Sequence, residues 1–232
     1  RQRQMCIRDS VYTIGEQIAE VLRAHQGLSR TAAWAKAIEL LDAVRIPNPR
    51  ARISDYPFQL SGGQRQRVMI AIALACEPKI LIADEPTTAL DVTVQAQIFD
   101  LLNDLRKQTG TAIILITHDM GAVAEMAERM IVMYAGRKAE EGPVQQVIDN
   151  AQHPYTRGLI SCVPHILETL TNERQTLKEI PGIVPSLRDF GKDRCLFASR
   201  CDNVSKKCRI KRPPETDCLN SQRVACWHTE SL

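Results

Sequence analysis

Short apolar segments of strand length alternate with segments of helical periodicity across residues 61–162, and this alternation constrains the fold more than any other feature. Ile80–Asp84 and Thr111–Thr117 are rich in apolar and β-branched residues, and Val92–Gln108 between them has helical spacing. Two strands joined through a helix are favoured to lie parallel in one sheet. The pattern therefore predicts an α/β fold with a parallel core.

The chain divides into four predicted stretches. Residues 11–60 form a helical subdomain, because Ile14–His25 and Thr31–Val44 have apolar residues at helical spacing before Pro47 and Pro49. Residues 61–163 hold the α/β core. Residues 164–232 form an irregular extension rich in cysteine. Arg1–Ser10 is polar, without a periodic pattern, and resembles a translated sequencing adapter, so we expect it to be an artefactual start.

Composition excludes two classes of protein. The formal net charge of +3 is too small to indicate a nucleic-acid partner. No apolar run reaches the roughly 18–20 residues that a membrane span needs. We therefore expect a cytoplasmic protein that reaches a membrane only through a partner.

Two adjacent carboxylates follow the first strand. Asp84 and Glu85 end the run Ile80–Glu85, so they are expected at the carboxyl edge of the sheet, where open α/β folds bind ligands. There Asp84 can hold Mg²⁺, and Glu85 can orient or deprotonate an attacking water. Taken alone, the pair can also be ordinary surface acids at a strand end.

A glycine-containing helix start and a histidine add to this edge. Ser61–Gln64 opens a helix, where glycines permit close approach of backbone N–H groups to a phosphate. His118 follows Thr111–Thr117 and can donate to a terminal phosphate. Each feature also has a plain structural explanation, a capped turn and a structural histidine respectively.

The set of motifs resembles the ATPases of ABC transporters. Leu60–Gln64 is similar to their signature motif, Ile80–Glu85 to the Walker B strand, Pro86–Asp91 to the D-loop and Thr117–Asp119 to the H-loop. The similarity covers Val11 to Cys162. It implies a P-loop NTPase-like parallel sheet with a helical subdomain.

The resemblance also implies roles. Members work as head-to-tail pairs, with ATP held between the P-loop of one subunit and the signature motif of the other. Asp84 would coordinate Mg²⁺, Glu85 would be the general base, His118 would sense the γ-phosphate, and Asp91 would connect the two sites. The residues that would bind the γ-phosphate of ATP held by the partner are Ser61, Gly62, Gly63 and Gln64.

The P-loop pattern G-x-x-x-x-G-K-[ST] does not occur in the sequence. The Walker A lysine and the Q-loop glutamine of the family would lie upstream of Val11, so we expect a chain truncated at its N-terminus. Without the P-loop, the β- and γ-phosphates lose their backbone cradle. We therefore predict that this chain neither binds ATP tightly nor hydrolyses it by itself.

The cysteines of the extension have metal-ligand character. The spacing suits an iron–sulfur cluster or zinc, although unligated thiols remain an alternative. The candidate ligands are Cys195, Cys201, Cys208 and Cys226, with Cys218 as an alternate. The extension resembles that of dipeptide and oligopeptide importer ATPases, on His153–Thr156, Pro181–Pro185 and Cys195–Cys201. That resemblance implies a [4Fe–4S] cluster.

The combined resemblance implies the ATP-binding subunit of a peptide importer at the cytoplasmic face of the inner membrane. Its partners would be a second ATPase subunit, two membrane-spanning permease subunits contacted by Ile14–Tyr56 and, indirectly, an extracytoplasmic substrate-binding protein. Dipeptides, oligopeptides, glutathione and nickel complexes all fit as substrates. The alternatives are a soluble non-transport ABC ATPase and a degenerate regulatory subunit that contributes only its signature motif.

Overall fold

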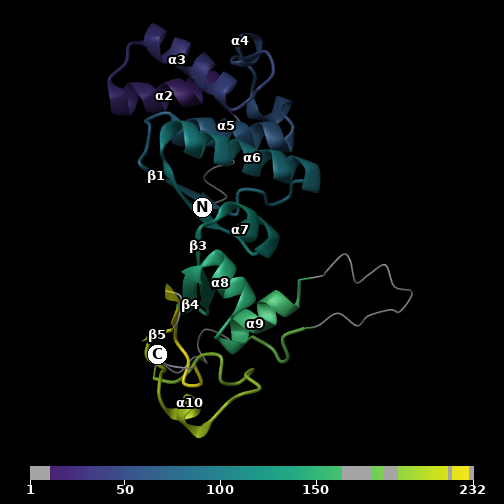
Figure 1. Ribbon diagram of the computed structural model, residues 1–232. Helices are drawn as coiled ribbons and strands as arrows, with labels where there is room; N and C mark the ends of the chain where they lie inside the picture. The colour runs from purple at the N-terminus through teal and green to yellow at the C-terminus, as the bar shows by residue number, and fades with distance from the viewer. Residues whose placement is uncertain (1–10, 164–178, 185–192, 219–220, 230–232) are drawn as a thin grey trace, which may run out of the picture. The chain divides into compact units, whose positions relative to one another are not determined.

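The computed structural model describes residues 11–163, 179–184, 193–218 and 221–229 (Figure 1). Contacts between residues divide the chain into two units, Arg1–His118 and Asp119–Leu232. Each unit is described by itself below. Among the helices of the described residues, none combines the length and the apolar character that a membrane-spanning helix needs.

The first unit begins with a helical layer, as the periodicity predicts. Thr13 and Ser29 cap two helices by accepting the backbone N–H of Glu16 and Ala32, respectively. The pair packs through fully buried side chains, including Ile18 and Leu41. The elements of this layer are α2 (Ile14–Gln26), α3 (Arg30–Ala43), α4 (Pro49–Arg52) and the 3₁₀ turn η1 (Pro57–Gln59).

The rest of the first unit is a βαβ arrangement preceded by a helix. Strands β1 (Ile80–Asp84) and β2 (Ala112–Ile116) pair in parallel, which confirms the predicted parallel core. Helix α6 (Val92–Thr109) joins the two strands and packs beside α5 (Gly62–Leu74) (Figure 1). Asp91 caps α6, and Gly110 ends it in the left-handed conformation.

The two faces of this strand pair differ. In β1 the buried residues are Leu81 and Ala83, and they alternate with exposed ones. The other face carries isoleucines that are about half exposed or more: Ile80, Ile82, Ile114 and Ile116. An apolar face of this kind favours association with another polypeptide segment.

The second unit is built on an antiparallel sheet. Its strands lie in the order β3 (Arg129–Tyr134), β4 (Arg137–Pro143), β6 (Arg223–Val224) and β5 (Thr216–Asp217). The hairpin between β3 and β4 turns at Ala135 and Gly136. Four buried residues form a cluster between this hairpin and α8: Met130, Val132, Val144 and Val147. The helices are α7 (Met120–Met126), α8 (Val144–Asp149), α9 (Pro154–Ser161) and α10 (Lys206–Ile210).

The cysteine-rich extension is more ordered than the sequence pattern predicts. Its β6 pairs with β4, through Glu140 opposite Val224, so the extension adds two strands to the sheet of residues 129–143. Strands of two residues are too short to show alternation, which explains why the sequence indicated only irregular structure. The bounds of the four stretches predicted from the sequence remain predictions.

A buried junction joins β4 to α9. Glu140 is fully buried, and its carboxylate accepts the backbone N–H groups of Gln152 at 2.8 Å and His153 at 3.0 Å. The imidazole of His153 caps α9 by accepting the N–H of Tyr155. Phe197 of the extension packs against both rings, so the extension and the hairpin share one core.

Candidate functional site

The parallel register places Glu85 beside the end of β2. Asp84 lies opposite Ile116, and the pairing continues one step further because the Glu85 N–H donates to the Ile116 carbonyl at 2.9 Å. Glu85 has a φ of 49°, in the left-handed region that non-glycine residues seldom adopt. The chain therefore turns sharply where the strand ends, a feature typical of functional sites in α/β folds.

Glu85 and His118 are in direct contact. The Nδ1 atom of His118 lies 2.9 Å from Oε1 of Glu85. The second carboxylate oxygen accepts a hydrogen bond from the Thr88 hydroxyl at 3.3 Å. Both side chains face solvent, with 87% of His118 and 38% of Glu85 exposed. The structure thus brings the two predicted catalytic residues together at the predicted edge of the sheet.

The contact determines the protonation of both groups. The hydrogen bond from His118 is the largest cause that lowers the pKa of Glu85, and the bond from Thr88 adds to it. A carboxylate can only accept, so Nδ1 carries a proton in this arrangement. Glu85 is therefore ionised at neutral pH and is held as an acceptor, the form that a general base needs.

Thr88 was not identified from the sequence. It lies three residues after Glu85, and its own N–H approaches the Glu85 carbonyl at 3.3 Å, which closes a turn. The signal for it was the Thr-Thr pair that follows Glu85 and Pro86, because a hydroxyl at such a turn can reach back to the first residue.

The signature segment forms a reciprocal cap on α5. The Gln64 N–H donates to the Ser61 hydroxyl at 3.3 Å, and the Ser61 N–H donates to Oε1 of Gln64 at 3.1 Å. This is a capping box, and it leaves the first turn of the helix open to solvent at Ser61 and Gly62. A helix of this length attracts a phosphate to its exposed N-terminus.

The glycines of this segment also have a packing role. A Cβ on Gly63 would lie 2.5 Å from Cγ1 of Val94 in α6, and one on Gly62 would lie 3.3 Å from Leu90. The signature helix therefore packs closely against the D-loop and the start of α6 in the same chain. Asp91, assigned to communication between sites, accepts the Val94 N–H at 3.0 Å in this structure.

Asp84, the predicted Mg²⁺ ligand, is exposed at the last position of β1. The predicted site residues thus form two local arrangements. Glu85 contacts His118, and Ser61 forms a capping box with Gln64.

The cysteines of the extension converge without forming a bonded cluster. All seven cysteines of the described residues are free thiols. The Cys195 N–H donates to the Cys208 carbonyl at 3.0 Å, and Sγ of Cys208 lies 3.7 Å from Nε2 of His228. Within the described ranges, no three His, Cys, Asp or Glu side chains are grouped closely enough to hold a single metal ion.

Two protein-family models match parts of this chain. The family model described as "ABC transporter" matches residues 2–88, and the model described as "Oligopeptide/dipeptide transporter, C-terminal region" matches residues 139–208. A relative from Sinorhizobium fredii, named "Probable peptide ABC transporter ATP-binding protein y4tR", is 48% identical over 224 residues. Those residues cover 96% of this chain and 65% of the relative, so the chain spans less than two thirds of its length.

Solved structures share the fold. A dimeric post-hydrolysis state of the ATP-binding cassette MJ0796, bound to ADP and Pi, is 32% identical with a TM-score of 0.51. The match covers 58% of this chain and 57% of that one. A second dimeric structure of MJ0796, titled as a bacterial ABC transporter cassette, is 33% identical with a TM-score of 0.51, at 58% and 57% coverage. This chain therefore joins a segment that matches the ABC transporter ATP-binding domain to one that matches the oligopeptide/dipeptide transporter C-terminal region.

Proposed function

We propose that this chain is part of the ATP-hydrolysing subunit of an ABC importer that takes up peptides. The observation that carries the proposal is the contact between Glu85 and His118 at the carboxyl edge of a parallel strand pair. The names of its relatives and the match of residues 139–208 to a peptide-transporter region support the substrate class. That match also favours an importer over a soluble, non-transport ATPase.

In the proposed reaction each residue has one task. Glu85 accepts a proton from the attacking water, because its carboxylate is ionised and keeps the hydrogen bond from Thr88 when His118 turns to the phosphate. His118 donates toward the γ-phosphate once nucleotide displaces its bond to Glu85. Asp84 offers an exposed carboxylate to Mg²⁺, an oxygen ligand of the kind that this ion prefers, and the bound ion would neutralise phosphate charge.

The signature cap serves a nucleotide held by a second ATPase subunit. Ser61 and Gly62 are exposed at the start of α5, and a facing P-loop would place its phosphate there. The dimeric cassette structures similar to this chain support such a pair. Asp91 lies at the adjoining start of α6, suited to link the two sites.

The resemblance to peptide importers also implies membrane partners. Two membrane-spanning permease subunits would hold the protein at the cytoplasmic face of the inner membrane, with a substrate-binding protein on the other side. An exposed surface next to the signature segment suits a permease contact: the rings of Tyr56 and Phe58 stack 5.5 Å apart, and Phe58 is 68% exposed.

The proposal extends to a [4Fe–4S] cluster on four cysteines of the extension: Cys195, Cys201, Cys208 and Cys226. Every pair among these thiols interacts electrostatically, and burial followed by these interactions raises the pKa of Cys195. Cys218 interacts with Cys226 alone among them, so it stays the alternate. Zinc is the alternative occupant of the same thiols, because both zinc and iron–sulfur clusters bind cysteine thiolates.

The ATPase proposal is tested with a chimera of the Sinorhizobium fredii relative, assembled with its importer partners. In the chimera, this chain replaces the segment of the relative that it matches, and the relative supplies the P-loop. We expect Glu85→Gln to retain ATP binding and to lower hydrolysis and uptake of a labelled peptide at least about 100-fold. Glu125→Gln, an exposed acid on α7, is the matched control and should leave both unchanged. Undiminished hydrolysis in the Glu85 variant would refute the proposed role.

The cluster is tested on this chain after anaerobic purification, by iron and sulfide analysis and visible absorption. We expect Cys195→Ser to lose the absorption, while Cys76→Ser in the first unit keeps it. Zinc bound in place of iron would overturn the cluster proposal and leave the ATPase proposal intact.

A further inference from the structure

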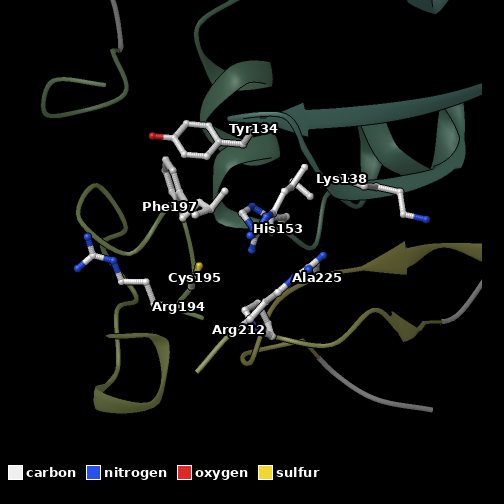
Figure 2. Close-up of a pocket in the computed structure, with 12 residues that line it drawn as sticks. Tyr134, Lys138, His153, Arg194, Cys195, Phe197, Arg212 and Ala225 are labelled. Carbon is white, nitrogen blue, oxygen red and sulfur yellow. The ribbon is translucent and has the colours of Figure 1, made fainter. Parts of the chain in front are cut away.

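A hollow lies in the second unit among the β3–β4 hairpin, the start of α9 and the cysteine-rich extension (Figure 2). Figure 2 shows His153 and Phe197 at its centre, the sulfur of Cys195 below Phe197, and Arg212 beside Ala225. No role in ATP hydrolysis involves these residues. All of them belong to one compact unit, so the hollow does not depend on how the two units are arranged.

Fixed contacts hold the walls of the hollow. The Ala225 N–H donates to the Ala139 carbonyl at 2.8 Å, which ties the end of the chain to β4. The ring of Phe197 meets that of Tyr134 edge to face, with centroids 5.2 Å apart. Glu140 fixes the backbone of His153 from behind. Walls built from three segments in this way give a preformed cavity, which lowers the entropic cost of binding.

The charged residues around the hollow are all basic. Four cations line it, and no carboxylate of the described residues does: the cations are Arg137, Lys138, Arg194 and Arg212. Lys138 points outward in Figure 2 and binds Glu141 and Glu215, so its charge is compensated. Arg194 also points away from the centre, whereas Arg212 runs along the hollow toward Ala225. Among the cations labelled in Figure 2, Arg212 is therefore the one best placed to meet a bound anion.

His153 supplies a neutral donor at the floor. Burial, with a smaller effect of Arg157, lowers the pKa of His153 to about 4. Its Nδ1 accepts the Tyr155 N–H at 3.0 Å, so the single proton of the neutral ring must be on Nε2. The ring lines the hollow, and this N–H can donate to an oxygen without any change of charge.

Other residues that line the hollow are apolar. They include Leu196, Phe197, Pro213 and Ala225. A phosphate ion would make no apolar contact with these side chains. A carboxylate with a short hydrocarbon body would contact both the apolar residues and the basic ones. We propose that the hollow binds a small organic monocarboxylate, with its carboxylate at Arg212 and the His153 N–H and its hydrocarbon body against Phe197 and Leu196.

The experiment is calorimetric titration of the full chain at constant ionic strength. The probe is isovalerate, and its neutral isostere isovaleramide, acetate and inorganic phosphate are the comparison ligands. We expect isovalerate to bind most tightly, acetate and phosphate more weakly, and the amide not measurably. Equal binding of the amide, or phosphate binding as tightly as isovalerate, would overturn the proposal.

Two arginine variants separate a local contact from general attraction. Arg212→Gln should weaken isovalerate binding about tenfold, the effect of losing one charge-assisted hydrogen bond. Arg209→Gln removes the same charge from an exposed residue of α10 that does not line the hollow, and should change binding less than about twofold. Equal losses in the two variants would show non-specific attraction. Because both arginines are exposed, neither change should unfold the unit, and the fluorescence of Trp227 checks this.

Discussion

Glu85 and Glu140 are both glutamates associated with strands, and their surroundings differ in every respect. Glu85 is 38% exposed at the end of β1, and its oxygens are held by the side chains of His118 and Thr88. Glu140 is fully buried within β4, and its oxygens are held by two backbone N–H groups. A carboxylate bound by mobile side chains can exchange them for a substrate, whereas one bound by backbone stabilises the fold.

The two histidines repeat the contrast. His118 is 87% exposed and contacts a carboxylate, while His153 is 4% exposed and contacts a backbone amide. Burial and the kind of partner therefore distinguish the proposed site of the first unit from the buried junction of the second. The three predictions below use this difference, from the largest expected effect to the smallest.

Replacing Glu140 should have the largest effect on stability. Glu140→Ala leaves the N–H groups of Gln152 and His153 buried without acceptors, which we expect to cost about 2–5 kcal/mol of unfolding free energy in the second unit. Glu85→Gln, at an exposed position, should change stability by less than about 0.5 kcal/mol.

The measurement is urea denaturation in a Trp34→Phe background. The chain has two tryptophans, Trp34 in the first unit and Trp227 in the second, so this background reports the second unit alone. Similar midpoints for Glu140→Ala and the parent would show that the buried carboxylate does not hold the β4–α9 junction.

The pH dependence of stability should follow His153. Its folded pKa is about 4, below the unfolded value of about 6.5, so the unfolded chain binds more protons between these pH values. The contribution of His153 is therefore complete above pH 6.5 and is lost as the pH falls toward 4. The difference amounts to about 3 kcal/mol at most.

His153→Asn supplies the matched comparison for that slope. Asparagine keeps an oxygen that can accept the Tyr155 N–H, but it does not titrate. Denaturation between pH 7 and 4 should show a shallower loss of stability in this variant than in the parent. Parallel curves for the two proteins would mean that another group controls the acid response of this unit.

The same contrast explains how much the sequence could predict. The strand Ile80–Asp84 and the parallel partner Ala112–Ile116 follow from apolar runs, and the meeting of Glu85 with His118 follows from their positions after adjacent strands. Such features depend on local pattern and on one rule of sheet geometry. Features of this kind can therefore be predicted from the sequence alone.

The second unit was less predictable because its contacts join distant segments. No local sequence pattern indicates that Glu140 is buried, since its partners lie 12 and 13 residues further on. The strands β5 and β6 have two residues each, and the hollow beside Phe197 needs three segments in place. Pairings of this kind leave no periodic signal.

The smallest expected change in stability concerns Gly63, which we compare with its neighbour Gly62 in the first unit. Sequence reasoning assigned this glycine to phosphate approach, but a Cβ here would lie 2.5 Å from Val94, against 3.3 Å from Leu90 at Gly62. Gly63→Ala should cost about 1–2 kcal/mol in urea denaturation followed by Trp34, since overpacking outweighs the gain in helix propensity. Gly62→Ala should be close to neutral, and Val94→Ala should restore most of the loss. A Gly63 variant as stable as the parent would leave phosphate approach as the sole reason for this residue.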